Sequence, residues 1–282
     1  MPAISSTAPG KVILFGEHSV VYGHPAIAVP VTDVRARAII QATPRSSTGD
    51  IIVDAPDINL SASFNDLPHE HPIAAAIRLV QSALSISTLP ACKIRVTSTI
   101  PIAAGLGSGT AISVALIRAL STFLGRPLPD EQVSSMVFEV DKIHHVNPSG
   151  IDNSVITFVK PIYFVRDKPI EIINVSDPFT ILIADTGIQS PTATTVKNLR
   201  KSWEADPYTY NNIFSSVEEI VISARTAIET GNLSKLGDLM TQNHILLTEL
   251  DVSSPELDYL VDSALKAGAL GAKMSGGGRG GN

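Results

Sequence analysis

The chain has little cysteine, few aromatic residues and no excess of positive charge. Cys92 is the single cysteine among 282 residues, which excludes a disulfide within the chain and suits a reducing compartment. We expect it to be a packed core residue. Aromatic residues make up 5%, the formal net charge is −6, and no Lys/Arg run forms a basic stripe, so we expect no nucleic-acid partner.

Long apolar runs are absent as well. No window approaches ~18 consecutive apolar residues, and the first residues lack the basic and apolar stretches of a signal peptide. These absences predict a cytoplasmic protein without a membrane partner. With 44% hydrophobic residues, the chain has enough apolar material for one large domain or two lobes with cores of their own.

Hydrophobic periodicity predicts an α+β fold. The expected strands are 11–15, 26–31, 34–42, 51–53, 92–97, 156–159, 162–165, 179–184 and 272–274, and the expected helices are 72–86, 108–123, 130–145, 194–203, 212–230, 233–250 and 254–267. Charged residues and prolines break the pattern near 170–180. We place a boundary there, between an N-terminal lobe, 1–175, and a helix-rich C-terminal lobe, 176–282.

The first segment with chemical character is 8–23, Ala-Pro-Gly-Lys-Val-Ile-Leu-Phe-Gly-Glu-His-Ser-Val-Val-Tyr-Gly. Glycines bracket a short apolar strand, with Lys11 at its start and Glu17-His18 just after its end. Polar groups so placed usually serve a ligand. The alternative is that Lys11 extends to solvent and that Glu17-His18 begins an ordinary turn.

The second segment, 101–111, is a glycine-rich turn, Gly105-Leu106-Gly107-Ser108-Gly109-Thr110, between a strand and a helix. Helix N-termini offer unpaired N–H groups and a positive dipole end to phosphate, and glycines let phosphate approach. The hydroxyl of Ser108 or Thr110 is a candidate Mg²⁺ ligand, and the alternative is that Ser108 only caps its helix. A dinucleotide site needs an acidic residue about 20 positions onward, after a second strand, whereas Asp130 begins a helix there. A Walker A loop is excluded because no Lys-Ser/Thr pair follows the glycines.

The third segment, 141–153, runs from Asp141 through a Pro-Ser-Gly turn to Asp152. Two carboxylates that flank a turn suit phosphoryl transfer. One of them holds Mg²⁺, and the other orients a substrate hydroxyl or accepts its proton.

These three segments resemble the motifs of the GHMP small-molecule kinases, and most closely those of the branch that phosphorylates mevalonate. The Gly-Glu-His-x-Val-Val-x-Gly run at 16–23 is typical of that branch, and the C-terminal Lys-Met-Ser-Gly-Gly-Gly run at 273–278 resembles the family's last glycine-rich loop. The resemblance implies a two-lobed GHMP kinase fold whose first lobe is of the ribosomal-protein-S5-like type. Family members continue beyond this loop, so we expect the C-terminal lobe to be incomplete and the chain to be part of a longer enzyme.

The resemblance also implies roles for individual residues. Lys11 and Asp152 are the expected catalytic pair, an ion pair that keeps both charged. Glu17, His18 and Thr192 are expected to face the acceptor substrate, mevalonate. The ATP phosphates are expected at Gly105, Leu106, Gly107, Ser108, Gly109 and Thr110, with Mg²⁺ on Ser108 and Asp141. Ser275, Gly276, Gly277 and Gly278 are the expected counterpart of the family's C-terminal glycine-rich loop. A homodimer is compatible with these expectations.

The chain departs from the family pattern at several positions. Asp141 stands where the family has glutamate, Gly109 where it has a second serine, and Ser190 where it has arginine. In the last loop, Arg279 and Asn282 stand where glycine and cysteine are usual, and Arg279 is a candidate ligand for phosphate or a substrate carboxylate. Two alternatives therefore stay open. One is another GHMP kinase acting on a phosphomevalonate or a sugar, and the other is a relative that binds nucleotide without turnover.

Overall fold

The computed structural model describes residues 3–101, 104–144 and 148–282, and these form two compact units that are interleaved in sequence. Unit 1 contains the residues up to Gly10, Val31–Pro101 and Gly107–Val159. Unit 2 contains Lys11–Pro30, the described part of 102–106, and Lys160–Asn282.

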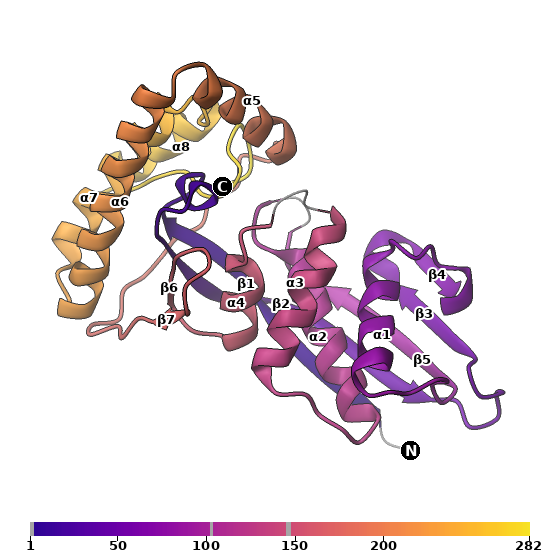
Figure 1. The fold of residues 1–282 in the computed structure, drawn as a ribbon. Coiled ribbons are helices and arrows are strands. Elements are labelled where there is room, and N and C mark those ends of the chain that lie inside the picture. The colour runs from indigo at the N-terminus through magenta and orange to yellow at the C-terminus, as the bar shows by residue number, and fades with distance from the viewer. Residues whose placement is uncertain (1–2, 102–103, 145–147) are drawn as a thin grey trace. The chain divides into compact units, whose positions relative to one another are not determined.

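The strands form a sheet in the order β4-β3-β5-β2-β6-β7, with β1 paired to β2 (Figure 1). They are β1 (Ile4–Phe15), β2 (Ala26–Ala42), β3 (Ile51–Ala55), β4 (Leu60–Ser63), β5 (Cys92–Ser98), β6 (Ile162–Phe164) and β7 (Glu171–Ile172). The second half of β2 pairs antiparallel with β5, Ala42 opposite Cys92, and its first residues pair antiparallel with β6, Ala26 opposite Phe164. β3 and β5 are parallel.

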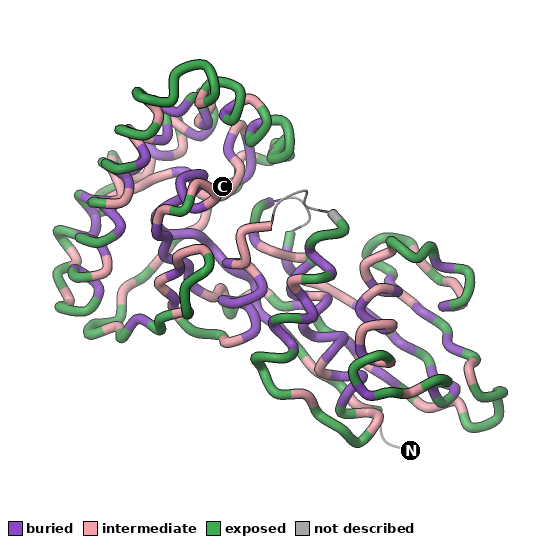
Figure 2. The backbone as a smooth tube through the Cα atoms, in the orientation of Figure 1, coloured by how far each residue is buried: buried purple, intermediate pink, exposed green. Residues whose placement is uncertain are grey.

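Unit 1 contains β3, β5 and the second half of β2 together with these helices of its described residues: α1 (Pro72–Ala83), α2 (Ser108–Phe123), α3 (Asp130–His144) and α4 (Ile151–Phe158). α2 is the central helix, because it packs against α1, α3, α4 and β5. Burial alternates along β5, with Ile94 inside and Lys93 and Arg95 exposed (Figure 2). Cys92 lies in this core, as predicted. Two 3-10 helices, η2 (Pro56–Ile58) and η3 (Phe64–Asp66), complete the unit.

Unit 2 contains the short 3-10 helix η1 (Ser19–Tyr22) and four helices: α5 (Thr192–Ala205), α6 (Pro207–Thr230), α7 (Leu233–Glu249) and α8 (Pro255–Lys266). Side chains cap three of these helices, Asp206 on α6, Asn232 on α7 and Ser254 on α8. A buried cluster holds them together: Leu199, Phe214, Leu247, Leu250, Val252, Leu257 and Met274. Within the described ranges, none of the helices is both long and apolar enough to cross a membrane.

The α+β class and the helix-rich second half are confirmed, whereas three expected strands are wrong. Residues 156–159 end helix α4, because the apolar run there is the last turn of an amphipathic helix that starts after Gly150. Residues 179–184 and 272–274 have no regular structure. Neither stretch has a ladder partner among the described residues, and Leu182 is 89% exposed. Residue 145, the expected end of α3, lies outside the described residues, and the lobe boundary near 175 stays a prediction.

Candidate active site

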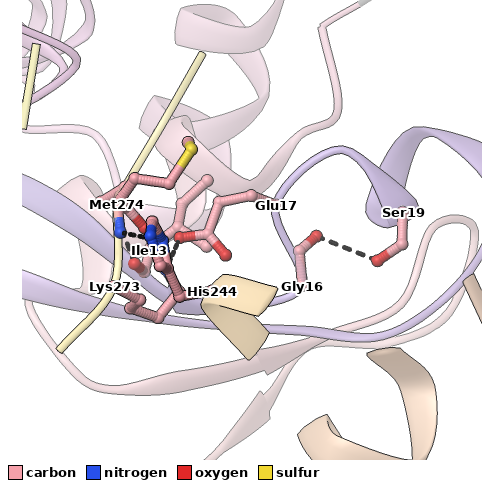
Figure 3. A network of polar contacts seen from close by, with 8 residues as sticks. Ile13, Gly16, Glu17, Ser19, His244, Lys273 and Met274 are labelled. Atoms are coloured by element: carbon pink, nitrogen blue, oxygen red, sulfur yellow. Dashed lines mark hydrogen bonds and ion pairs between the residues drawn. The ribbon is translucent and has the colours of Figure 1, made fainter. Parts of the chain in front are cut away.

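The end of β1 presents Glu17 and His18 because Gly16 turns the chain. Gly16 has φ +90°, and a Cβ at this position would lie 2.4 Å from the Pro25 carbonyl oxygen, so only glycine fits. The Ser19 hydroxyl closes the turn by donating to the Gly16 carbonyl at 3.2 Å (Figure 3). The resulting turn is buried, with Glu17 1% and His18 7% exposed. Glu17 and His18 do begin a turn, and that turn is buried and not solvated.

Glu17 forms a buried ion pair that the sequence did not predict. One carboxylate oxygen, Oε1, contacts the Lys273 ammonium, which also donates to the Met274 carbonyl at 2.5 Å (Figure 3). The other oxygen, Oε2, is buried without a hydrogen-bond partner among the described residues. Burial raises the pKa of Glu17, and the charge of Lys273 opposes that shift.

His18 is held in a strained backbone conformation with φ 63° and ψ −49°. Burial lowers the pKa of its imidazole to about 4, opposed by a hydrogen bond to the Gly277 backbone, so the ring is neutral at pH 7. Its Nε2 is buried without a partner among the described residues. Glu17 and His18 therefore carry two unpaired buried polar atoms on adjacent residues, which is typical of a site that receives a polar ligand.

The C-terminal glycine-rich loop lies against the same part of unit 2. The Ser275 hydroxyl donates to the Ile13 carbonyl on β1 at 3.0 Å. Gly277 contacts Thr192 so closely that a Cβ there would lie 2.2 Å from the threonine hydroxyl oxygen, and a Cβ on Gly278 would lie 1.9 Å from the Val252 carbonyl oxygen. These positions require glycine because the backbone of the loop packs directly against its neighbours.

Thr192 begins α5 and has a polar neighbour of its own. Its hydroxyl lies 3.1 Å from that of Ser190, which donates to the Gly278 carbonyl at 2.8 Å. Arg279 binds the Asp251 carboxylate at 2.6 Å and the Asp251 carbonyl at 3.0 Å. Its guanidinium is thus committed to the turn between α7 and α8.

The predicted phosphate loop has residues in both units. In unit 2, the Leu106 carbonyl accepts from the Lys11 backbone N–H at 3.0 Å, and a Cβ on Gly105 would lie 4.0 Å from the Gly276 Cα. The Lys11 side chain is buried, at 5% exposure for the residue, so the alternative of a solvated lysine is wrong. The two glycine loops are therefore neighbours within unit 2, and Lys11 is beside one of them.

In unit 1, the loop leads into α2 through Gly107, which takes the N-cap position with φ 74°. Ser108 is the first residue of the helix, and no side-chain cap bond forms, so the alternative that Ser108 caps α2 is wrong. Its hydroxyl lies 3.4 Å from that of Ser98. A Cβ on Gly109 would meet no described atom within 4 Å.

Asp141 on α3 lies next to this helix start. The Thr110 hydroxyl donates to both of its carboxylate oxygens, at 3.1 and 3.2 Å. No cluster of three or more His, Cys, Asp or Glu side chains that would hold a metal by itself occurs in the described parts of the chain. One carboxylate with nearby hydroxyls fits Mg²⁺, which usually takes one or two carboxylates and completes its shell with water and substrate phosphates.

Asp152 is half-buried in the first turn of α4. The next residue, Asn153, fixes that turn by donating to the Ser134 hydroxyl at 2.9 Å and the Ser134 carbonyl at 3.1 Å. Asp152 belongs to unit 1 and Lys11 to unit 2, and their ion pair stays a prediction.

The comparisons with known proteins agree with the motifs. The profile of the GHMP kinases N terminal domain matches residues 71–160, and that of the GHMP kinases C terminal domain matches residues 224–282. The chain belongs to the GHMP kinase family. The predicted fold and the predicted class of ATP-dependent small-molecule kinase are thereby confirmed.

Within the family, the similarity is to mevalonate kinases. The mevalonate kinase of Pyrococcus furiosus is 36% identical over an alignment of 295 positions, gaps included, which covers 99% of this chain and 87% of that protein. The crystal structure of Methanococcus jannaschii mevalonate kinase is 28% identical, with a TM-score of 0.81 and coverage of 99% of this chain and 89% of that one. The structure of L. major mevalonate kinase in complex with R-mevalonate is 31% identical, with a TM-score of 0.82 and coverage of 98% and 85%.

The structure groups the predicted residues into two sets. Lys11, Glu17, His18, Thr192, Gly105, Leu106 and the loop of Ser275–Gly278 lie in unit 2, and Gly107–Thr110, Asp141 and Asp152 lie in unit 1. Sequence reasoning missed Lys273 as a site residue. The available signal was a lone lysine inside the short apolar run that precedes the last glycine loop.

Proposed function

We propose that the chain transfers the γ-phosphoryl group of ATP to the 5-hydroxyl of mevalonate, an early step in the synthesis of isoprenoid precursors. The observation that carries the proposal is the pair of buried, unpaired polar atoms, Glu17 Oε2 and His18 Nε2. The mevalonate kinase relatives, one of them solved with R-mevalonate, support mevalonate as the molecule that meets them.

In this mechanism, the oxygen of the 5-hydroxyl attacks the γ-phosphorus while Asp152 accepts the hydroxyl proton. The bond between the γ-phosphorus and the β,γ-bridging oxygen breaks, and ADP leaves. Lys11 steadies the charge on the transferring group. Asp141 and a hydroxyl of Ser108 or Thr110 would hold Mg²⁺, which would neutralise phosphate charge. The backbone N–H groups at the start of α2 hold the ATP phosphates.

The same proposal includes Mg²⁺ as cofactor, a cytoplasmic location and a homodimer as the assembly. The donor set around Asp141 supports the metal. Size-exclusion chromatography with light scattering tests the assembly, and chelation followed by titration with Mg²⁺ tests the metal.

Substrate choice is tested by ADP release with ATP, Mg²⁺ and one acceptor at a time: mevalonate, phosphomevalonate, galactose or homoserine. We expect turnover with mevalonate alone. Turnover restricted to another acceptor replaces mevalonate in the proposal, and ATP binding without turnover on any acceptor supports the non-catalytic alternative.

Asp152→Asn tests the chemistry. We expect kcat to fall about 10²- to 10⁴-fold, because the amide accepts no proton, while ATP affinity measured by calorimetry stays within about twofold. The matched control is Asp130→Asn, on an exposed carboxylate at the start of α3 that binds Arg118. Equal kcat in Asp152→Asn and the parent chain would contradict the assigned role.

A further inference from the structure

Lys273 is a buried cation to which the mechanism above assigns no step. Its side chain is 2% exposed, and that of its partner, Glu17, is fully buried. The two residues lie 256 positions apart in the sequence, at the end of β1 and immediately before the C-terminal glycine loop (Figure 3). Both charged groups of a buried ion pair lose their hydration, which costs free energy. Stabilisation of the core therefore does not by itself explain a pair at this position.

The contacts of Lys273 define what it fixes. Its ammonium bridges Glu17 Oε1 and the Met274 carbonyl, and the Met274 N–H donates to His244 Nδ1 on α7 at 3.3 Å. His244 Nε2 in turn contacts the Asp258 carboxylate on α8 at 3.2 Å. This series of polar contacts therefore runs from α8 through α7 to Lys273 and ends on one oxygen of Glu17.

The other oxygen of Glu17 is left for a ligand. Oε2 is buried and has no partner among the described residues. An ionised carboxylate only accepts hydrogen bonds, whereas a protonated one also donates. The charge of Glu17 therefore decides whether a substrate hydroxyl meets a strong acceptor there or a weaker one that also carries a donor proton.

We propose that Lys273 is a positioning residue that keeps Glu17 ionised and oriented, so that Oε2 accepts a hydrogen bond from a hydroxyl group of the acceptor substrate. The proposal rests on the proposed function, since that function supplies a hydroxyl-bearing acceptor. It makes Lys273 a determinant of acceptor affinity and not of the phosphoryl-transfer step.

The charges around Glu17 support this role. Burial raises the pKa of the carboxyl, Lys273 is the largest opposing influence, and Lys11 on β1 opposes it less. His18 next to it is neutral at pH 7, and burial lowers the pKa of both His244 and Lys273, the latter against the opposing charge of Glu17. Asp258 and Asp262 are further charged groups of the network in the described parts of the chain. Removing the Lys273 charge leaves the effect of burial largely unopposed, so the pKa of Glu17 rises further.

The test is a set of pH profiles of kcat/KM for mevalonate, from about pH 5 to about pH 9, for the parent chain and for Lys273→Met, Lys273→Arg and Glu17→Gln. In Lys273→Met we expect KM for mevalonate to rise about 10- to 100-fold and the acid limb to move to higher pH. KM for ATP stays within about twofold, and Lys273→Arg restores much of the loss because it keeps the charge. The control Lys266→Met, on an exposed lysine of α8, leaves both values unchanged.

A purely structural role of Lys273 predicts a different result, namely that kcat/KM of Lys273→Met for mevalonate falls by the same factor at every pH. That outcome, or an unmoved acid limb, overturns the proposal. If Lys273→Met does not fold, the double variant Glu17→Gln/Lys273→Met is compared with Glu17→Gln, and a further rise in the mevalonate KM above about fivefold overturns it, because Lys273 acts through Glu17. Failure of the proposed function is separate and is visible as absent turnover of mevalonate by the parent chain.

Discussion

Single glycines near the end of β1 set the conformation of the candidate site. Comparing Gly16 with Gly23 separates the cost of a positive φ from the cost of a close backbone contact. Gly16 and Gly23 have nearly the same φ, +90° and +93°, but a Cβ would lie 2.4 Å from the Pro25 carbonyl oxygen at Gly16 and would meet nothing within 4 Å at Gly23. Gly23→Ala should therefore cost about 1–2 kcal/mol of unfolding free energy, from φ alone. Gly16→Ala should cost about 1–3 kcal/mol more, from the forced backbone shift.

Urea unfolding of the two alanine variants beside the parent chain measures this difference. Because the backbone angle is matched, equal destabilisation of Gly16→Ala and Gly23→Ala would show that the close approach to Pro25 has no energetic role.

The neutral ring of His18 makes stability depend on pH. Its pKa is lowered from 6.5 to about 4, so between pH 6.5 and about pH 4 the unfolded chain binds a proton that the folded chain does not bind. By linkage, this stability contribution is complete above pH 6.5 and is lost as the pH falls toward 4, by at most about 3 kcal/mol. The raised pKa of Glu17 acts in the opposite direction, because as the pH falls the folded chain takes up the Glu17 proton at a higher pH than the unfolded chain does.

His18→Asn isolates the histidine contribution, since asparagine does not titrate and tolerates positive φ. Unfolding free energies of both proteins, measured by urea titration at several pH values, should converge as the pH falls, with the parent chain losing more. Parallel pH curves for the two proteins would be evidence against burial as the cause.

Sequence reasoning at the residue scale found the polar positions but not all of their partners. Glu17 and His18 were predictable because polar residues follow an apolar strand at a glycine. Lys273 was not, because its partner is 256 positions away and no local pattern connects them. The commitment of Arg279 to Asp251 was also hidden, since the turn between α7 and α8 that brings them together is a tertiary feature.

At the scale of elements, α2 and α3 form the part of unit 1 that carries the metal candidates. The link is the Thr110 hydroxyl, which donates to both oxygens of Asp141 at 3.1 and 3.2 Å. Thr110→Val removes this donor and leaves a buried carboxylate with fewer hydrogen bonds, which should cost about 1.5–3 kcal/mol of stability. We also expect the Mg²⁺ concentration needed for half-maximal activity to rise about 10-fold, because the ligand is less well oriented.

Thr110→Ser is the matched variant, because it keeps the hydroxyl and loses only a methyl group. Thermal unfolding and Mg²⁺ titration of turnover should rank it between the parent chain and Thr110→Val. A Thr110→Val protein with the parent chain's Mg²⁺ dependence would show that the Thr110 hydroxyl neither binds the metal nor orients Asp141 toward it.

Elements were predictable where local pattern and tertiary partner agree. The strand-turn-helix around Ser108 was found because the apolar strand, the glycines and the small apolar helix residues are all local signals. Residues 156–159 were assigned to a strand because a short apolar run has no visible period, and only the helix start at Gly150 decides it. Residues 179–184 have the composition of a strand, but a strand also needs a hydrogen-bonding neighbour, and composition carries no information about one.

At the scale of the whole molecule, each unit is assembled from distant parts of the sequence. Unit 2 joins Lys11–Pro30 to Lys160–Asn282, and it holds Glu17 on the first segment and Lys273 on the second. Tyr22 from the first segment also packs with Phe214 of α6, with ring centroids 4.4 Å apart, and with Trp203 of α5 at 5.2 Å. The fragment 160–282 therefore lacks both the charge partner of its buried lysine and an aromatic neighbour of its core.

We accordingly expect fragment 160–282, expressed alone, not to form the native unit. Breaking a buried ion pair by removal of one partner costs about 3–5 kcal/mol, which is a large part of the stability of a typical domain. Loss of β1 and of the start of β2 also exposes the edge of β6, whose Phe164 pairs with Ala26.

A ¹H–¹⁵N correlation spectrum should show poor amide dispersion, and Trp203 emission should lie at the wavelength of a solvated indole. A dispersed spectrum with blue-shifted Trp203 emission would mean that the core around Phe214 suffices without Glu17 and Tyr22. Lys273→Met in the same fragment separates the two contributions, because it removes the unpaired charge and leaves the missing aromatic contact as it was.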